Sequence, residues 1–277
     1  MINFNTFKNY KSDFYFLSWF ARFSDAECLF YIKPLKNVKG IITSFTFRFA
    51  IKLHKDDKKV LDYINKKLGV GQVYLRNENA EYVIEKFSNI KNVIIPIFIK
   101  NKLYSNKWLD FLDFYKAKEL YKKSLNSLPV QKTKLIYKIL KLKLGMITGR
   151  KLLKFKFNEP YKLETNIIIP EHNLHWIIGF IEGDGSFYLK NLKPGFSINQ
   201  KYISLLVLKA IEDFFMKLPN NYKLTINSPN QFSNKSFNKK TKCIIFSWSN
   251  LDTLHDYLLP FFEKYSNVFL TRKKEDF

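Results

Sequence analysis

The chain has 277 residues and a hydrophobic content of 46%, which is enough for one large globular domain or two of ordinary size and excludes a disordered protein. Its 47 lysines and arginines outnumber its 24 acidic residues, giving a net charge of +23. This excess predicts a polyanionic partner, and nucleic acid is favoured over a membrane because no apolar run reaches the ~20 residues of a spanning helix. The two cysteines, Cys28 and Cys243, exclude a disulfide framework and a cysteine-rich zinc site.

The N-terminal residues contain neither an apolar signal core nor an arginine-rich amphipathic presequence. We therefore expect the protein to act in the compartment where it is made. Heavy use of lysine, asparagine, isoleucine, phenylalanine and tyrosine is typical of an AT-rich coding sequence such as that of an organelle genome.

The first predicted element is an apolar helix that begins near Phe14 and ends in an acidic turn. Residues 14–32 read FYFLSWFARFSDAECLFYI, so Asp25 and Glu27 lie where the helix gives way to a strand. A second strand is predicted at 45–54, FTFRFAIKLH, where apolar residues alternate with a basic, solvent-facing set. An amphipathic helix at 60–68 that Gly69 closes and a strand at 72–76 complete the sheet region.

A lysine-rich connector separates the two halves of the chain at 128–170. Within it, KTKLIYKILKLKL shows helical spacing of Leu135, Ile136, Ile139 and Leu140. A solvated helix and a helix lying on phosphates are both consistent with this charge run.

The stretch 174–189, LHWIIGFIEGDGSFYL, repeats the pattern of the first predicted helix. Trp176 aligns with Trp19, Glu182 with Asp25, and Asp184 with Glu27. A single EGDG would be explained by a helix C-cap with Gly185 in a left-handed conformation, but two copies indicate an internal duplication. Because a carboxylate at a helix C-terminus is disfavoured by up to ~1 kcal/mol, a divalent cation is the expected compensating partner.

The second half continues as the first does. A strand at 196–202, FSINQKY, has Phe196 and Ile198 on its inward side, and an amphipathic helix at 205–215 follows. Further strands are predicted at 222–226 and 242–249. Residues 88–111 resemble 249–277, with Pro96 aligned to Pro260, but the first half continues into another helix. We therefore expect the second half to lack its C-terminal helix.

The two acidic motifs, WFARFSDAE and WIIGFIEGDG, together with the strands and the basic connector, resemble the two-motif, single-chain LAGLIDADG homing endonucleases of organelle introns and their maturase relatives. The segments FRFAIKLHKDD, LGVGQVY, YSNKWLDFLDF and GMITGR are also similar to landmarks of that family. The resemblance extends from about residue 14 to residue 277.

The resemblance implies an α+β fold in which an αββαββα half is repeated about a pseudo-two-fold axis. Each half has a four-stranded antiparallel saddle sheet, and the two motif helices pack at the domain interface, through Ala21, Arg22, Ile178 and Gly179. The expected domains are 1–127, a linker at 128–170, and 171–277. The expected state is a monomer in the mitochondrion.

The resemblance also implies a metal-dependent site that hydrolyses both strands of a DNA duplex, with Mg²⁺ or Mn²⁺ as cofactor. Glu27 and Asp184 would bind metal, together with the carbonyl groups of Ala26 and Gly183. Lys107 and Lys273 are the candidate catalytic lysines, whose positive charge would stabilise negative charge near the metals, and solvated surface lysines are the alternative. The expected contacts to nucleic acid come from the outward residues Arg48, Lys52, His54, Arg76, Lys190, Asn199, Lys201 and Lys223.

The first motif departs from the family pattern at two places. Arg22 stands where the second motif has Gly179, a position kept small because the helix backbones approach closely. A guanidinium there needs a carboxylate or carbonyl partner unless it emerges at one end of the seam. Cys28 replaces Gly185 and Leu29 replaces Ser186, so the turn after Glu27 loses its easiest left-handed residue.

Three functional hypotheses follow from these observations. The first is a site-specific DNA endonuclease. The second is an RNA-binding, maturase-like splicing factor acting on intron RNA or rRNA, and the third is a lapsed member that serves as a structural component of a ribonucleoprotein.

Overall fold

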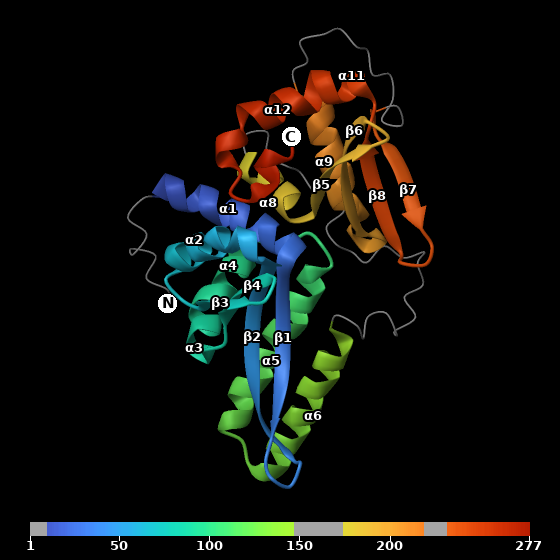
Figure 1. Ribbon diagram of the computed structural model, residues 1–277. Coiled ribbons are helices and arrows are strands. Elements are labelled where there is room, and N and C mark those ends of the chain that lie inside the picture. The colour runs from blue at the N-terminus through green and yellow to red at the C-terminus, as the bar shows by residue number, and fades with distance from the viewer. Residues whose placement is uncertain (1–9, 147–173, 219–231) are drawn as a thin grey trace. The chain divides into compact units, whose positions relative to one another are not determined.

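The computed structural model describes residues 10–146, 174–218 and 232–277, and for residues 10–13 it describes the backbone only (Figure 1). These residues form two compact units. The first contains Cys28–Leu103 and the chain from Lys107 into the connector; the second contains helix α1 (Tyr10–Glu27), Tyr104–Asn106 and everything described from helix α8 (Leu174–Asp184) onward. The predicted strand at 222–226 and the connector beyond residue 146 lie outside the described residues.

The first unit is built on an antiparallel sheet of strand order β1-β2-β4-β3. Strands β1 (Cys28–Lys36), β2 (Ile42–His54) and β3 (Gln72–Arg76) were expected, whereas β4 (Asn79–Ile84) was not. The alternation in β2 is confirmed at Phe45, Phe47, Phe49 and Ile51, which are all buried. Ala50 is also buried although the alternation places it on the solvent-facing side.

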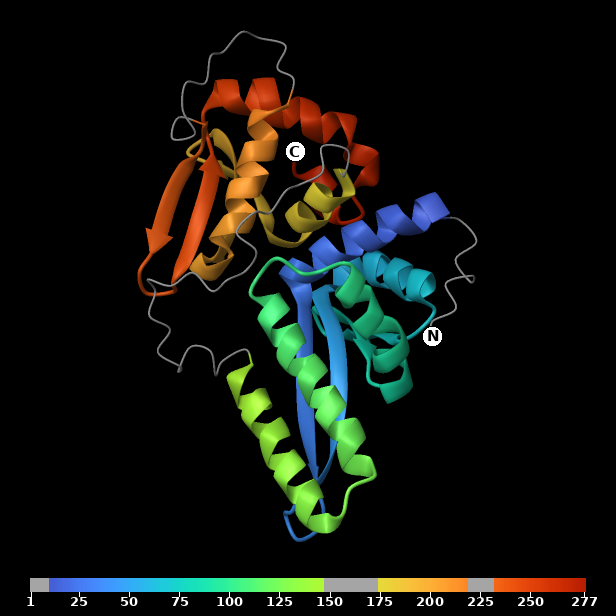
Figure 2. The same cartoon turned by 180° about the vertical axis from the view of Figure 1, so that it is seen from behind.

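Helices cover one side of this sheet. Helix α2 (Lys58–Leu68) buries Val60, Leu61, Ile64 and Leu68, as its spacing predicts, and ends at Gly69 with φ at 67°. Helix α5 (Lys107–Leu125) lies over β1 and β2, and α6 (Pro129–Gly145) packs along it (Figure 2). Ile139 is the fully buried residue of α6, and the lysines around it are on the outer side.

The second unit repeats this arrangement. Its sheet has the order β5-β6-β8-β7, formed by β5 (Gly185–Lys190), β6 (Lys193–Lys201), β8 (Cys243–Trp248) and β7 (Asn234–Asn238). Phe196 and Ile198 are buried as predicted, and helix α9 (Leu205–Met216) buries Leu208, Ile211 and Phe215. The two sheets of equal topology confirm the predicted α+β tandem repeat.

A matching irregularity occurs in the helical segment near the end of each half. In the first unit, α3 (Phe87–Asn89), a π-helical turn (Ile90–Ile94) and α4 (Ile95–Lys100) follow one another, with Pro96 near the start of α4. The second unit has α11 (Leu251–Thr253), a π-helical turn (Leu254–Leu258) and α12 (Leu259–Lys264), with Pro260 at the same place. Proline cannot donate to the preceding turn, and the wider π turn accommodates it in both copies.

Phenylalanine clusters fix the ends of the halves. Phe111 has its ring centroid 5.6 Å from that of Phe30 and 5.8 Å from that of Phe98. In the second unit, Phe277 lies 5.2 Å from Phe187 and 5.3 Å from Phe262. These partners are equivalent in the alignment of the two halves, so the aligned Asp-Phe pairs occupy equivalent places in the two cores.

Four short 3-10 helices complete the described elements, at Lys55–Asp57, Tyr202–Ser204, Ser266–Val268 and Arg272–Glu275. None of the helices in the described ranges combines the length and apolar character of a membrane-spanning segment.

Two glycines after α2 allow a matched test of the fold. Gly69 and Gly71 both have positive φ, but a Cβ at Gly69 would meet nothing within 4 Å, whereas one at Gly71 would lie 2.6 Å from the Tyr82 ring. Gly69→Ala is expected to cost about 1–2 kcal/mol through backbone strain alone. Gly71→Ala should cost more, because Tyr82 is buried and donates to the carbonyl of Val70. Urea unfolding measures both, and equal costs would contradict this packing.

Candidate active site

The two motif helices lie side by side within the second unit (Figure 1). A Cβ added to Gly179 would come within 2.4 Å of the Trp19 carbonyl oxygen, and one added to Gly183 within 2.1 Å of the Ala26 Cβ. Helix α8 therefore approaches α1 at two points where only glycine fits. The four residues proposed for the helix interface, Ala21, Arg22, Ile178 and Gly179, are all buried.

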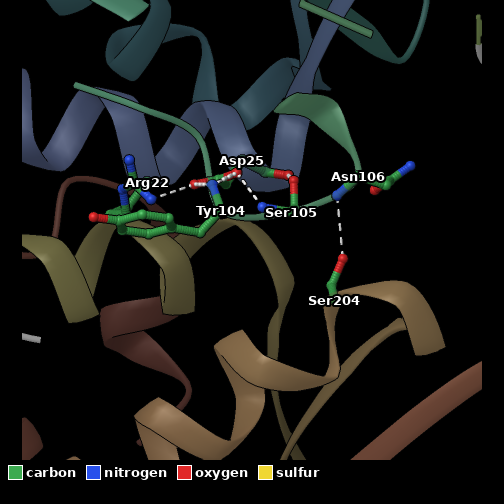
Figure 3. A network of polar contacts seen from close by, with 6 residues as sticks. All are labelled: Arg22, Asp25, Tyr104, Ser105, Asn106 and Ser204. Atoms are coloured by element: carbon green, nitrogen blue, oxygen red, sulfur yellow. Dashed lines mark hydrogen bonds and ion pairs between the residues drawn. The ribbon is translucent and has the colours of Figure 1, made fainter. Parts of the chain in front are cut away.

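Arg22 stays inside the unit and has a carboxylate partner. It is 3% exposed, and its Nη1 lies 2.7 Å from an Oδ of Asp25 (Figure 3). Its guanidinium lies over the ring of Tyr104, 4.2 Å from the centroid, and 5.3 Å from that of Trp176. The large side chain is thus accommodated between aromatic rings, where a guanidinium stacks favourably.

Asp25 holds the short segment that leads into Lys107. Its carboxylate accepts hydrogen bonds from the backbone N–H groups of Tyr104 (2.8 Å) and Ser105 (2.8 Å), and its carbonyl accepts one from the Ser105 hydroxyl (Figure 3). Burial raises the pKa of the Asp25 carboxyl, while Arg22 and these N–H groups oppose the rise. The Asn106 N–H continues the network to the Ser204 hydroxyl at 3.2 Å.

Glu182 does the same for the segment that leads into Lys273. It accepts hydrogen bonds from the N–H groups of Leu270 and Thr271, each at 2.5 Å, and from the Trp19 indole at 2.5 Å. Burial is the main cause that raises its pKa, and the same hydrogen bonds oppose it. Asp25 and Glu182 are therefore equivalent clamps: each carboxylate accepts hydrogen bonds from two consecutive backbone N–H groups in the segment before a lysine. The two acids differ in side-chain length.

The two lysines that follow these clamped segments both donate to backbone carbonyl groups. In the first unit, the Lys107 Nζ donates to the Cys28 carbonyl at 2.5 Å. In the second unit, the Lys273 Nζ donates to the carbonyls of Gly183 (2.7 Å) and Ile181 (3.4 Å). An ammonium group at the C-terminus of a helix interacts favourably with the helix dipole. The Lys273 ammonium thus lies at the C-terminus of α8, and the Lys107 ammonium contacts the first residue of β1, which directly follows the first motif in the sequence.

The second acid of each motif differs from the first in exposure. Glu27 and Asp184 are the last residues of α1 and α8 and are half-buried, whereas Asp25 and Glu182 are 1% and 2% exposed. A Cβ on Gly183 would lie 3.5 Å from the Glu27 Cγ, so both acids are at the same end of the helix pair. The half-buried pair can contact a ligand, and the buried pair cannot.

Gln200 is a site residue that the sequence analysis missed. It lies on β6, is 9% exposed, and donates from its Nε2 to the Asp184 carboxylate. The sequence did contain a signal for this residue, because the alternation that places Phe196 and Ile198 on the inward side of the strand also places Gln200 there. The strand registers align Ile198 with Ile51, so the first half has Leu53 at the equivalent position.

The expectation of a left-handed residue after each motif was wrong. Gly185 is the first residue of β5, and Cys28 is the buried first residue of β1; neither has positive φ. Glycine is needed at 185 for a different reason, since a Cβ would lie 2.6 Å from the Ile181 carbonyl oxygen. Replacement by Cys28 in the first motif therefore leaves the turn itself unstrained.

The residues proposed to contact nucleic acid differ in their surroundings. Lys52, Lys190, Asn199 and Arg76 are exposed on the sheets. His54 accepts from the Asp56 N–H at 3.4 Å as the cap of a 3-10 turn, and the Lys201 Nζ donates to the Thr241 carbonyl at 2.7 Å. Arg48 is ion-paired with Glu81 at 2.7 Å. Lys223 lies outside the described residues.

Hard cations are the ligands that this end of the helix pair fits. It offers two half-buried carboxylates and the carbonyl groups before them, which are oxygen donors of the kind that Mg²⁺ takes. Within the described parts of the chain, no three His, Cys, Asp or Glu side chains come together as a complete metal site. Water and substrate oxygens would have to complete the coordination of any ion held here.

Comparison with known proteins identifies the class to which this arrangement belongs. The model of the LAGLIDADG endonucleases matches residues 20–118, which include the first motif from Phe20 onward and the sheet after it. This match of residues 20–118 to the LAGLIDADG endonuclease model agrees with the resemblance that the two motifs suggested.

Three fungal proteins are similar over most of the chain. A probable intron-encoded endonuclease, Cox1-I1b of Schizosaccharomyces pombe, is 30% identical over 74% of this chain and 50% of its own length. The probable intron-encoded endonuclease 2 of Neurospora crassa is 25% identical over 90% and 55%, and the uncharacterized mitochondrial protein RF1 of Saccharomyces cerevisiae is 27% identical over 99% and 56%. The chain thus spans about half the length of these relatives.

Solved structures share the fold. The LAGLIDADG homing endonuclease I-GzeII, in complex with its DNA target, superimposes with a TM-score of 0.72 at 25% identity and covers 94% of this chain and 86% of its own. I-SmaMI, bound to uncleaved DNA in the presence of calcium ions, gives 0.73 at 20% identity, with coverage of 94% and 87%.

The Arg22–Asp25 pair gives a prediction with a defined pH dependence. Arg22→Met should destabilise the chain by about 3–5 kcal/mol near pH 7, because it leaves a buried carboxylate without its counter-charge. It also removes an influence that lowers the pKa of Asp25, so that pKa rises further above its unfolded value. A carboxyl with a raised folded-state pKa contributes stability at acid pH that is lost as pH rises. Urea unfolding should therefore show a smaller cost at pH 4 than at pH 7.

The double variant Arg22→Met/Asp25→Asn is the matched control. An asparagine oxygen still accepts from the N–H groups of Tyr104 and Ser105 but carries no charge. Most of the lost stability should return at pH 7, with little dependence on pH. A cost that is the same at both pH values in the single variant would show that the pair is not a buried ion pair.

Proposed function

We propose that this chain is a site-specific endonuclease, encoded by a mobile organelle intron, that cuts both strands of a DNA duplex by metal-dependent phosphodiester hydrolysis. One observation carries the proposal. In both motifs a buried acid clamps the segment that leads into a lysine, while the acid two residues later is half-buried at the helix end. A binding protein without chemistry has no need for two such equivalent pairs of acids.

Glu27 and Asp184 would hold the metal, with the carbonyl groups of Ala26 and Gly183. Mg²⁺ is the expected ion and Mn²⁺ its substitute, because both take oxygen donors and keep water ligands. When bound, such an ion supplies an activated water and stabilises negative charge on the phosphate oxygens. Asp184 is oriented for this role by Gln200, whose amide N–H fixes one carboxylate oxygen.

Lys107 and Lys273 would stabilise the charge that develops at the phosphate. Their ammonium groups donate to backbone carbonyl groups, and these contacts leave the positive charge of each lysine in place. The clamps at Asp25 and Glu182 keep the preceding residues in place. The lysines are thereby positioned before substrate binds, which avoids an ordering cost in the transition state.

Duplex DNA is the proposed partner, bound by a monomer through the outward basic residues of the two sheets. The similarity to endonucleases solved with DNA supports this choice over RNA, so a maturase role is not favoured. The mitochondrial relative and the intron-encoded relatives support action in the mitochondrion. We propose 1–127, 128–170 and 171–277 as the limits of the two repeats and their linker.

Cleavage of DNA that spans the insertion site of the host intron tests the proposal. The wild-type chain should linearise a plasmid carrying this site when Mg²⁺ is present and leave it intact with EDTA. Asp184→Asn should lower the cleavage rate by roughly 10²–10³-fold, the scale at which one charge-stabilising group acts, without loss of DNA binding. Gel-based cleavage and electrophoretic mobility shift measure the two effects.

Asp213→Asn is the matched control, because Asp213 is an exposed aspartate on α9. It should cut as the wild type does. Undiminished cutting by Asp184→Asn, or no Mg²⁺-dependent cutting by the wild-type chain, would overturn the proposed function.

A further inference from the structure

Four charged side chains form a cluster on the solvent-facing side of the first sheet. Arg48 of β2 contacts Glu81 of β4, with Nη2 2.7 Å from Oε1, and Glu85 just beyond β4, with Nη1 3.2 Å from Oε1. The Nε of Arg76, on β3, lies 3.9 Å from the second oxygen of Glu81. We refer to Arg48, Arg76, Glu81 and Glu85 as the arginine–glutamate cluster.

Strand register places Glu81 in the middle of this side of the sheet. Lys52 is its partner on β2 and Tyr74 its partner on β3. Glu81 is therefore surrounded by strands on both sides, and its side chain is only 15% exposed. An acid at the centre of a basic surface requires an explanation other than solubility.

The same register shows how Arg48 must lie. Phe49 pairs with Ile84, so Arg48 is beside Glu85, and Glu81 is four residues further back along β4. A guanidinium that contacts both acids has to lie along the sheet, above the pair Ala50 and Val83. These two residues are buried although they are on the solvent-facing side, which agrees with a side chain lying over them.

The cluster has no net charge, since two arginines balance two glutamates, in a chain with an excess of +23. It therefore adds nothing to the general attraction for phosphates, and its carboxylates repel them. What it offers is a planar donor group held in one orientation by two acceptors. An arginine held in this way has the geometry to donate two hydrogen bonds to guanine O6 and N7, and a glutamate can accept from cytosine N4.

We propose that Arg48 reads a guanine in the major groove and that Glu81 and Glu85 are positioning residues that keep it from binding phosphates indiscriminately. The inference rests on the proposed function, because it assigns a specificity element to the DNA-binding surface of the endonuclease. The carboxylates contribute specificity by opposing the wrong contact: they repel phosphates, and the guanidinium that they hold still has N–H groups to donate to a base edge that offers two acceptors.

Selection from a library of randomised DNA duplexes tests this assignment without knowledge of the target. The full-length wild-type chain should enrich guanine at one position, about 5- to 150-fold over other bases, the range that a bidentate base contact gives. Arg48→Gln should abolish that preference alone. Arg48→Lys keeps the charge but not the planar fork, so it should lose the preference as well.

Glu81→Gln separates positioning from a purely structural role. It should weaken the preference at the same position, raise affinity for unrelated duplexes, and steepen the log–log salt dependence of that binding by about 0.9 as a guanidinium becomes free to bind a phosphate. Glu263→Gln is the matched control. Glu263 is an exposed glutamate on α12, outside the strands of either sheet, and its substitution should change neither base preference nor salt dependence.

Three results would overturn the proposal: uniform loss of affinity in Arg48→Gln with the base preference intact, retention of the preference in Arg48→Lys, or a Glu81→Gln variant that behaves as Glu263→Gln does. Thermal unfolding of each variant shows that the fold is intact. Failure of the wild-type chain to bind any duplex would instead overturn the proposed function, and the wild-type arm alone reveals it.

Discussion

The backbone of α8 touches that of α1 at Gly179 and Gly183, where any Cβ would collide with the Trp19 carbonyl or with Ala26. This close approach brings the ends of the two helices together, so that Glu27 and Asp184 lie at one end of the pair. It also buries the first acid of each motif, since Asp25 and Glu182 lie two residues earlier, inside the helix pair. A buried carboxylate must find hydrogen-bond donors, and both acids find them in the backbone of a distant segment. The placement of the lysine-bearing segments thus depends on the packing of two helices.

The two copies satisfy this requirement by different means. Glu182 is long enough to reach the Trp19 indole as well as two N–H groups. Asp25 is shorter by one methylene group, and Arg22 fills the remaining space and supplies the counter-charge. A buried ion pair has a large desolvation cost, and removing one partner is far worse than having neither. Arg22 is therefore tolerated in a position where its counterpart is glycine because the shorter acid and the rings of Tyr104 and Trp176 leave room for it and stabilise it.

The two sheets have the same topology but differ in the chemistry of their solvent-facing sides. The first carries Arg48, Arg76 and two glutamates in close contact, whereas the second has Ser197 and Asn199 at the corresponding level, with lysines at the strand ends. Equivalent cores with different outer side chains are what a duplicated fold allows, since alternate residues of a strand face opposite ways and can change independently. In the interior the repeat is closely kept, down to the proline and the π turn in each half.

The periodicity and the internal repeat of the sequence alone determined several of the helices and strands and the pairing of the acids. The alternation at 45–54, the helix spacing at 60–68 and the alignment of Asp25 with Glu182 and Glu27 with Asp184 are all visible in one sequence, because period and repeat are local properties. The roles of these acids depend on contacts with segments that are distant in the sequence. Asp25 and Glu182 bind N–H groups about 80 or 90 positions away in the chain, Gln200 reaches Asp184 from strand β6, and Arg48 meets Glu81 on a neighbouring strand that the sequence did not reveal. Only the tertiary structure could decide which acid of each motif is buried and hydrogen-bonded inside the protein and which can contact a ligand. Burial and hydrogen-bond partners depend on segments that meet only after folding.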